Sequence, residues 1–189
     1  RSMNRVLPAP LPVLFTLPQY EMLDENNKPF GSKDLKGKPY IASFFFTTCP
    51  TVCLETLKEL QRIQKRVKGL GDHVALVSFT VDPSVDTPQV LFRKARELEA
   101  NPFVWKFLTS SEEQMKDLLV NHFKVPMEGK EKNAQNIWDI AHSSKLALVD
   151  QEGNILKYYS LKKVEIDQMM IDLGLLVNRH RLTFKGKGE

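Results

Sequence analysis

Long apolar runs are missing from this 189-residue sequence. Its longest apolar stretches fall far short of the roughly 18–20 residues that a membrane-spanning helix needs, and no apolar core of a signal peptide is visible. Internal repeats and low-complexity tracts are missing too. We therefore expect a soluble chain. Because it opens Arg1-Ser2-Met3, which does not look like a native start, any membrane contact would be made through an N-terminal anchor that this sequence does not include.

Positive charge is scarce in the body of the chain, although the formal net charge is +4. Arg1 and Arg5 contribute +2 and residues 178–189 contribute +3, which leaves residues 6–177 with a net charge of −1. This distribution does not indicate a nucleic-acid groove. With 42% hydrophobic residues, the chain is long enough for one globular domain with a full core. We expect a core over residues 14–177, followed by a basic tail over residues 178–189.

Cysteine is scarcer still, because the chain has two, Cys49 and Cys53. Residues 39–46 form a short apolar and aromatic run, typical of a buried strand in a sheet covered on both faces. Residues 52–67 have helical spacing of apolar side chains and end at a glycine. Since proline suits the first position of a helix, Pro50 predicts that Cys49 is the N-cap and that Cys53 lies one turn inside.

The position of the two cysteines suggests chemistry. The free N–H groups and the dipole at a helix N-terminus favour a thiolate, so Cys49 is the expected nucleophile. Residues four apart in a helix have β-carbons about 5–6 Å apart, whereas a disulfide requires about 3.5–4.5 Å. A disulfide between Cys49 and Cys53 would therefore distort the first turn, and a metal ion would bridge the sulfurs with less adjustment. The alternative is two unrelated core cysteines.

The remaining sequence alternates strand and helix patterns. This order predicts an α/β sandwich with a central mixed sheet. Residues 124–137 are polar and irregular, and we expect a long inserted loop there. The other expected elements are an N-terminal strand over 14–23 with a turn over 24–28, a strand over 73–81, a helix capped by Thr87 and reaching 100, a strand over 103–108, a helix to 123 opened by a Ser110/Glu113 capping box, a hairpin over 145–159 and a helix over 164–177.

A cysteine pair at the end of an early strand in this order is the thioredoxin-like arrangement. Over residues 14–177 the chain also resembles the SCO/SenC family of copper-handling proteins. Three stretches carry the resemblance: residues 45–53 read FFTTCPTVC, residues 78–87 read SFTVDPSVDT, and residues 139–143 read DIAHS before the hairpin. The resemblance implies a thioredoxin-like fold with an N-terminal strand extension, and an inserted loop before the histidine segment.

The family resemblance implies that Cys49, Cys53 and His142 are copper ligands. Two thiolates and an imidazole form a soft, low-coordination set that suits Cu(I), and imidazole also tolerates Cu(II). Zinc is a competitor for such a set, but structural zinc usually has a fourth protein ligand. In thioredoxin-like redox enzymes a cis-proline faces the cysteines at the place of the His142 segment. A ligand there instead of proline favours metal binding over general disulfide exchange.

The chain departs from the family at three positions. The family usually has aspartate immediately before the histidine, proline after the second cysteine, and often aspartate between the cysteines. This sequence has Ala141, Leu54 and Thr51 at those positions. Because acceptors around a ligating histidine fix its ring, Ala141 predicts a less firmly oriented imidazole at His142.

The implied function is a metallochaperone that delivers copper to the binuclear copper site of cytochrome c oxidase, or prepares the cysteines of that site. The expected partner is the copper-site subunit of the oxidase or another copper or thiol protein. We expect a bacterial monomer in the periplasm or at the extracytoplasmic face of the inner membrane, which binds and delivers rather than catalyses.

A thiol–disulfide oxidoreductase is the alternative, with Cys49 as the attacking thiol and Cys53 as the resolving one. A peroxiredoxin is excluded by its motif, which has threonine three residues before the reactive cysteine and proline seven before. Here those positions are Phe46 and Ala42.

Most other polar and aromatic residues are interpreted as structural, whereas Trp138 is a candidate either for a wall of the His142 site or for packing. Asp82 and Asp86 are expected in turn and capping roles, and the isolated histidines at the surface or at helix ends. The methionines are too scattered for a methionine copper motif. The histidines meant here are His73, His122 and His180, and the methionines are Met115, Met127, Met169 and Met170. The aromatics are Trp138 and the core residues Phe44, Phe45 and Phe46.

Overall fold

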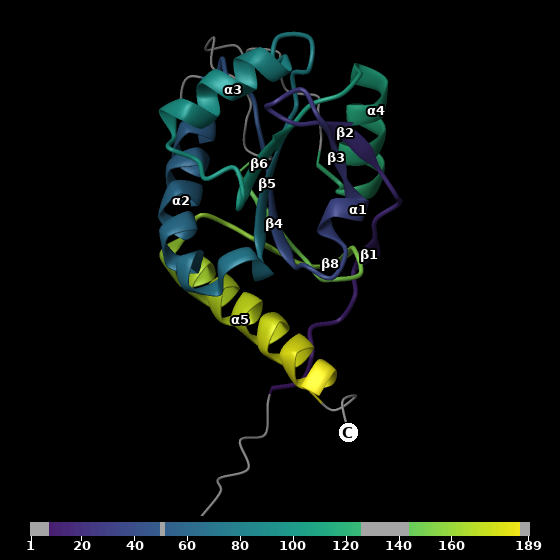
Figure 1. Ribbon diagram of the computed structural model, residues 1–189, viewed down its shortest axis with the longest axis vertical. Helices are drawn as coiled ribbons and strands as arrows, with labels where there is room; N and C mark the ends of the chain where they lie inside the picture. The colour runs from purple at the N-terminus through teal and green to yellow at the C-terminus, as the bar shows by residue number, and fades with distance from the viewer. Residues whose placement is uncertain (1–7, 50–51, 126–143, 186–189) are drawn as a thin grey trace, which may run out of the picture.

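The computed structural model describes residues 8–49, 52–125 and 144–185 (Figure 1). A six-stranded mixed sheet with the order β1-β8-β7-β4-β5-β6 forms the centre. β4 pairs in parallel with β5, and β5 with β6, while β7 runs antiparallel to β4. The strands are β1 (Phe15–Thr16), β4 (Tyr40–Phe45), β5 (Ala75–Thr80), β6 (Trp105–Leu108), β7 (Leu146–Val149) and β8 (Asn154–Tyr159).

Helices cover both faces of this sheet. Figure 1 shows α2, α3 and α5 on one side of the sheet and α1 and α4 on the other. A separate hairpin of β2 (Glu21–Leu23) and β3 (Pro29–Gly31) precedes β4. The helices are α1 (Ser32–Leu35), α2 (Val52–Arg66), α3 (Pro88–Glu97), α4 (Glu112–Lys116) and α5 (Lys163–Lys185), with a 3₁₀ segment η1 (Val67–His73) and a π-helical segment η2 (Asp117–His122). The predicted mixed sheet between helices is confirmed.

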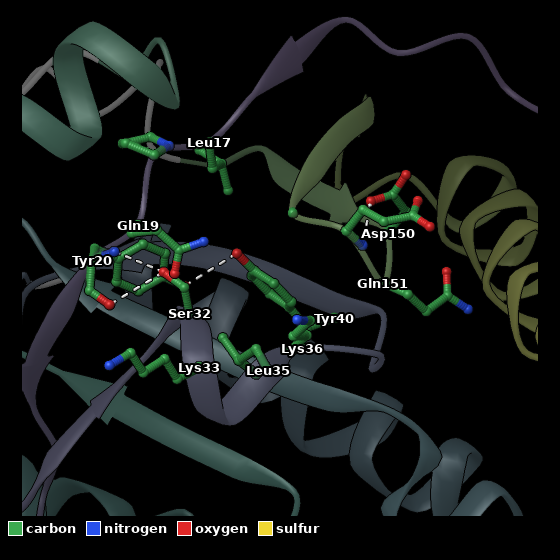
Figure 2. A pocket seen from close by; sticks show the side chains of 13 residues that line it. Leu17, Gln19, Tyr20, Ser32, Lys33, Leu35, Lys36, Tyr40, Asp150 and Gln151 are labelled. Atoms are coloured by element: carbon green, nitrogen blue, oxygen red, sulfur yellow. Dashed lines mark hydrogen bonds between the residues drawn. The ribbon is translucent and has the colours of Figure 1, made fainter.

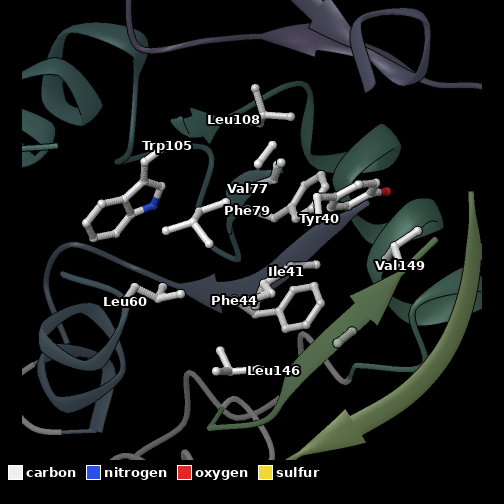
Figure 3. Packing of buried hydrophobic residues seen from close by; sticks show 14 of the residues in the cluster. Tyr40, Ile41, Phe44, Leu60, Val77, Phe79, Trp105, Leu108, Leu146 and Val149 are labelled. Atoms are coloured by element: carbon white, nitrogen blue, oxygen red, sulfur yellow. The ribbon is translucent and has the colours of Figure 1, made fainter. Parts of the chain in front are cut away.

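The two central strands are buried along their whole length. Every residue of β4 and of β5 is buried, as expected for strands covered on both faces. Figure 3 shows residues of this core from several elements, among them Leu60 of α2 and Leu146 of β7. Phe44 of β4 and Phe79 of β5 stack on each other, with ring centroids 6.1 Å apart. Because both strands end at the same edge of the sheet, the residues that follow β4 and β5 are brought together there.

The N-caps of α3 and α4 test two predicted helix starts. One is confirmed and one is corrected. Thr87 caps α3 as predicted, and its hydroxyl accepts the N–H of Val90. The capping box at Ser110 is wrong by one residue, because Ser111 is the N-cap of α4 and accepts the N–H of Gln114 at 3.2 Å. The Ser110 hydroxyl contacts the Gln114 side chain instead and so cannot cap the helix.

Two predicted boundaries are also corrected. The expected strand over residues 14–23 is divided into β1 and β2, and Pro18, which has no N–H to donate, lies between them. The expected tail over residues 178–189 begins as part of α5, which continues to Lys185. No glycine or proline interrupts residues 178–185, so the helix extends through its arginines.

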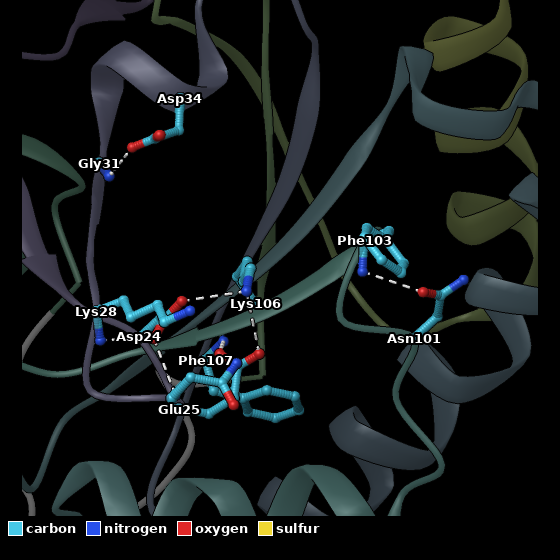
Figure 4. A network of polar contacts seen from close by, with 10 residues as sticks. Asp24, Glu25, Lys28, Gly31, Asp34, Asn101, Phe103, Lys106 and Phe107 are labelled. Atoms are coloured by element: carbon cyan, nitrogen blue, oxygen red, sulfur yellow. Dashed lines mark hydrogen bonds and ion pairs between the residues drawn. The ribbon is translucent and has the colours of Figure 1, made fainter.

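A buried ion cluster joins the turn before β3 to β6 (Figure 4). The Lys106 ammonium lies 3.1 Å from Asp24 and 3.4 Å from Glu25, and both carboxyl groups are almost fully buried. Burial raises the pKa of Glu25, although its hydrogen bonds and Lys106 oppose the shift. The cluster therefore depends on Lys106, the cation that compensates the two acids.

Replacing that cation should destabilise the fold. We expect Lys106→Met to lower the free energy of unfolding at pH 7 by about 3 kcal/mol, because it leaves two buried carboxylates without a cation. Since the folded-state pKa of Glu25 is already raised, its contribution to stability is present below the ordinary value of 4.5 and is lost as pH rises. The loss caused by Lys106→Met should therefore shrink on acidification.

Urea unfolding at several pH values measures this effect. Lys94→Met is the control, because Lys94 pairs with the exposed Glu97 and should change stability by less than about 1 kcal/mol. Equal losses in the two variants at pH 7 would contradict the role given to Lys106.

Candidate metal centre

Cys49 lies in a tight turn that follows β4. Its backbone N–H donates to the carbonyl of Phe46 at 3.2 Å, which closes the turn with Thr47 and Thr48 at its corners. The Cys49 side chain is half-buried and packs against the hydrophobic core, while Phe46 is buried within the core. Cys49 is thus held at the edge of the sheet with part of its surface open to solvent.

Cys53 occupies a more protected position. It is the second residue of α2 and is only 2% exposed, so its side chain belongs to the core. The described part of this helix begins at Val52, so the predicted position of Cys53 one turn inside the helix stays a prediction. No disulfide joins the two cysteines in this structure. Pro50 and Thr51 lie outside the described residues, so the predicted helix cap at Cys49 stays a prediction.

A fully buried carboxylate ties the Cys49 turn to β5. Asp86 Oδ2 accepts the backbone N–H of Thr47 at 3.0 Å and the hydroxyl of Thr80 at 2.6 Å. Asp86 Oδ1 contacts the hydroxyl of Thr47, which donates to it. Thr80 is the last residue of β5, so one side chain connects the segments that follow two neighbouring parallel strands. The sequence pattern predicted a turn or capping role for Asp86 and missed this connection.

Asp82 has the turn role that the sequence predicts. Its carbonyl accepts the N–H groups of Val85 and Asp86, and its own N–H donates to the Thr80 hydroxyl at 3.0 Å. Ser84 donates to the Asp82 carboxylate at 3.1 Å. These contacts stabilise the loop between β5 and α3.

Several predicted residues lie outside the described part of the chain. They are His142 itself, the neighbouring Ala141 and Trp138, Met127, and most of the predicted loop over residues 124–137. Within the described residues, no group of three or more histidine, cysteine or acidic side chains is arranged to hold a metal ion. The described donors of the predicted copper site are therefore the two thiols.

The remaining candidates have structural surroundings. His73 is exposed at the end of η1, and His122 lies 3.7 Å from Asp117. Met115 and Met169 are fully buried core residues. Phe44 and Phe45 are core residues as predicted.

The cavity in Figure 2 is lined by residues from the segment before β4 and from the turn between β7 and β8. It has a volume of about 400 Å³ and is lined by Tyr20 and Tyr40, whose hydroxyls are 3.1 Å apart. Burial raises the pKa of Tyr40. Because Tyr40 begins β4 and Cys49 follows its end, this cavity is at the opposite edge of the sheet and does not serve the thiols.

Comparison with known proteins gives a consistent match. A model of the SCO1/SenC family matches residues 13–177. The chain is 30% identical to a SCO1/SenC family lipoprotein from Bacillus anthracis, and the two structures superpose with a TM-score of 0.77 over 89% of this chain and 99% of that one.

Two further structures resemble the chain. ScoI of Arabidopsis thaliana with copper bound is 27% identical, with a TM-score of 0.68 over 87% of this chain and 98% of that one. BsSco, a member of the Sco family of cytochrome c oxidase assembly proteins in which a disulfide switch has been identified, is 25% identical, with a TM-score of 0.76 over 89% and 98%. These likenesses and the mixed sheet confirm the predicted thioredoxin-like architecture.

The unequal burial of the thiols predicts unequal reactivity. In the folded, reduced protein, iodoacetamide should modify Cys49 at least about tenfold faster than Cys53, because access limits the reaction of a buried thiol. Mass spectrometry of digested samples at timed intervals measures the two rates. In denaturing urea, as the control, the rates should converge. Faster modification of Cys53 in the folded protein would contradict the described site.

Proposed function

The chain belongs to the SCO1/SenC family, and from that membership we propose that it binds copper through Cys49, Cys53 and His142 for the assembly of cytochrome c oxidase. The observation that carries the proposal is the presence of two thiols that follow β4 with no disulfide between them, inside a fold shared with the copper-bound ScoI of Arabidopsis thaliana. Copper is here the cargo of the protein.

The donor chemistry of the described residues fits this cargo. Thiolates are soft ligands that select Cu(I). No disulfide joins the two cysteines, and Cys53 is the second described residue of α2 while Cys49 lies in the turn before it. Cys53 is buried and Cys49 is half-buried. A site with one shielded and one accessible sulfur can retain copper and also present it to an incoming ligand from a partner.

His142 is proposed as the third ligand, on the resemblance of residues 139–143 to the family. It follows Cys49 by 93 positions in the sequence, so folding must bring it to the sulfurs. An imidazole completes a three-donor set for Cu(I) and also allows Cu(II) to bind.

The proposed partner is the subunit of cytochrome c oxidase that carries its binuclear copper site, since BsSco belongs to a family of oxidase assembly proteins. We place the protein as a monomer on the extracytoplasmic side of a membrane. The placement at a membrane is supported by the similar SCO1/SenC family protein of Bacillus anthracis, which is a lipoprotein. Across the helices that the structure describes, none is long and apolar enough to cross a membrane.

Thiol–disulfide exchange is the second candidate, supported by the accessible and buried pair of thiols and by the disulfide switch of BsSco. The Cys49 thiolate would attack a partner disulfide, forming a mixed disulfide and releasing one partner thiolate. The Cys53 thiolate would then displace the second partner sulfur and form the Cys49–Cys53 disulfide. Two electrons would thus pass to the partner, which leaves with two thiols.

Copper stoichiometry tests the first candidate. The reduced protein should bind one copper ion, and serine at Cys49 or at Cys53 should abolish tight binding, because a serine hydroxyl does not ionise at neutral pH. Metal analysis after competition with a Cu(I) chelator measures this. Thr48→Ala, an exposed change in the same turn, is the matched control and should bind normally. Undiminished Cu(I) affinity in Cys53→Ser would refute the site.

His142→Ala separates the two candidates. Copper affinity should fall strongly, because two thiolates alone leave copper without its third donor. The reduction potential of the Cys49–Cys53 couple should move by no more than a few tens of millivolts, where 30 mV corresponds to about 1.4 kcal/mol. Chelator competition and glutathione redox titration measure the two quantities.

The exposed His73 provides the control, since His73→Ala should change neither quantity. If His142→Ala keeps copper affinity and loses reductase activity, the histidine transfers protons for thiol exchange, and the oxidoreductase becomes the correct assignment.

A further inference from the structure

We propose that Asp86 is a positioning residue for the cysteine pair, because its carboxylate holds the turn that carries Cys49. It binds no copper itself and acts through Thr47. The copper readout of this proposal rests on the proposed copper-binding function, whereas its thiol readout does not.

The carboxylate of Asp86 is surrounded by donors. It is 0% exposed, and it accepts the N–H of Thr47, the hydroxyl of Thr47 and the hydroxyl of Thr80. Two of these three donors belong to Thr47, so the Asp86 carboxylate fixes both the backbone and the side chain of Thr47. A buried acceptor with several converging donors specifies position strongly, since each donor would be left unsatisfied if it moved.

Thr47 transmits this constraint to Cys49 through the turn. Phe46 begins the turn and is buried in the core, Thr47 is bound to Asp86, and the Cys49 N–H closes the turn on the Phe46 carbonyl at 3.2 Å. With the first two residues fixed and the fourth hydrogen-bonded to the first, the backbone of Cys49 has little freedom. Loss of the Thr47 contacts would release the corner of the turn and let the Cys49 sulfur move relative to Cys53.

Asp86 is itself held by regular structure. Its N–H donates to the carbonyl of Asp82 at 2.9 Å, and the next residue, Thr87, caps α3. Thr80, which also binds the carboxylate, ends β5. The cysteine turn is therefore fastened to α3 and β5, two elements that carry no copper ligand in the proposed site.

Substitutions at position 86 can separate the effect of its hydrogen bonds to Thr47 from the effect of its negative charge. Asparagine at position 86 could keep its oxygen toward the Thr47 N–H and turn its amide toward the Thr47 hydroxyl, which can accept as well as donate. Asp86→Asn would then keep the turn in place without a negative charge. Asp86→Ala offers no acceptor and would release it.

The test compares Cu(I) affinity with thermal stability in four variants. Asp86→Ala should weaken Cu(I) binding about 10–100-fold, Asp86→Asn should stay within about threefold of the wild type, and Thr47→Val should fall between them. The control is Asp150→Ala. Asp150 is another buried aspartate that accepts three hydrogen bonds, in the turn between β7 and β8.

The control turn lies at the opposite edge of the sheet from Cys49, because Val149 pairs with Tyr40. Asp150→Ala should lower the melting temperature as much as Asp86→Ala does but leave copper affinity unchanged. Equal copper loss in the two alanine variants would overturn the proposal. So would an Asp86→Asn variant as weak as Asp86→Ala, since charge would then be the cause. Thr47→Val provides the test if Asp86→Ala does not fold.

A second readout needs no copper. Alkylation of Cys49 should be several-fold faster in Asp86→Ala than in the wild type or in Asp150→Ala, because a released turn exposes the sulfur. Equal rates would overturn the positioning role. If the wild-type protein binds no copper, the proposed function fails, and the alkylation rates still decide the role of Asp86.

Discussion

The parallel pairing of β4 with β5 is the constraint on which the site depends. Both strands are buried throughout, so neither can shift its register without moving core side chains to the wrong face. Their shared direction brings the turn after β4 and the loop after β5 to one edge of the sheet. The Asp86 carboxylate can bind Thr47, 39 positions earlier in the sequence, because of this arrangement.

The two thiols that follow β4 differ in their exposure to solvent. Cys49 ends a turn at the rim of the sheet, whereas Cys53 points into the core from the first described turn of α2. A metal carrier needs both qualities, since a ligand that is fully buried cannot hand over its cargo and one that is fully exposed cannot protect it. The disulfide chemistry of the alternative function would use the same asymmetry, so the two functions share one geometry.

Most of the strands and helices could be predicted from the sequence, because apolar periodicity and capping residues are local patterns. The apolar run before Cys49 predicted β4, and the Thr87-Pro88 pair predicted the start of α3. The cap at Ser110 failed because two adjacent serines compete for one role, and the Gln114 side chain, which Ser110 contacts, is visible only in the structure. The bond between Thr47 and Asp86 was missed because no local pattern signals a contact between two loops. The contribution of His142 is still a prediction from the family resemblance.

The central claim is that copper is held by the sulfurs of Cys49 and Cys53 together with one histidine nitrogen. X-ray absorption spectroscopy at the copper edge of the Cu(I)-loaded protein tests it most directly. The account predicts two sulfur scatterers at thiolate distance and one nitrogen scatterer from imidazole, with the nitrogen signal lost in His142→Ala. A first coordination sphere made of nitrogen and oxygen without sulfur would contradict it.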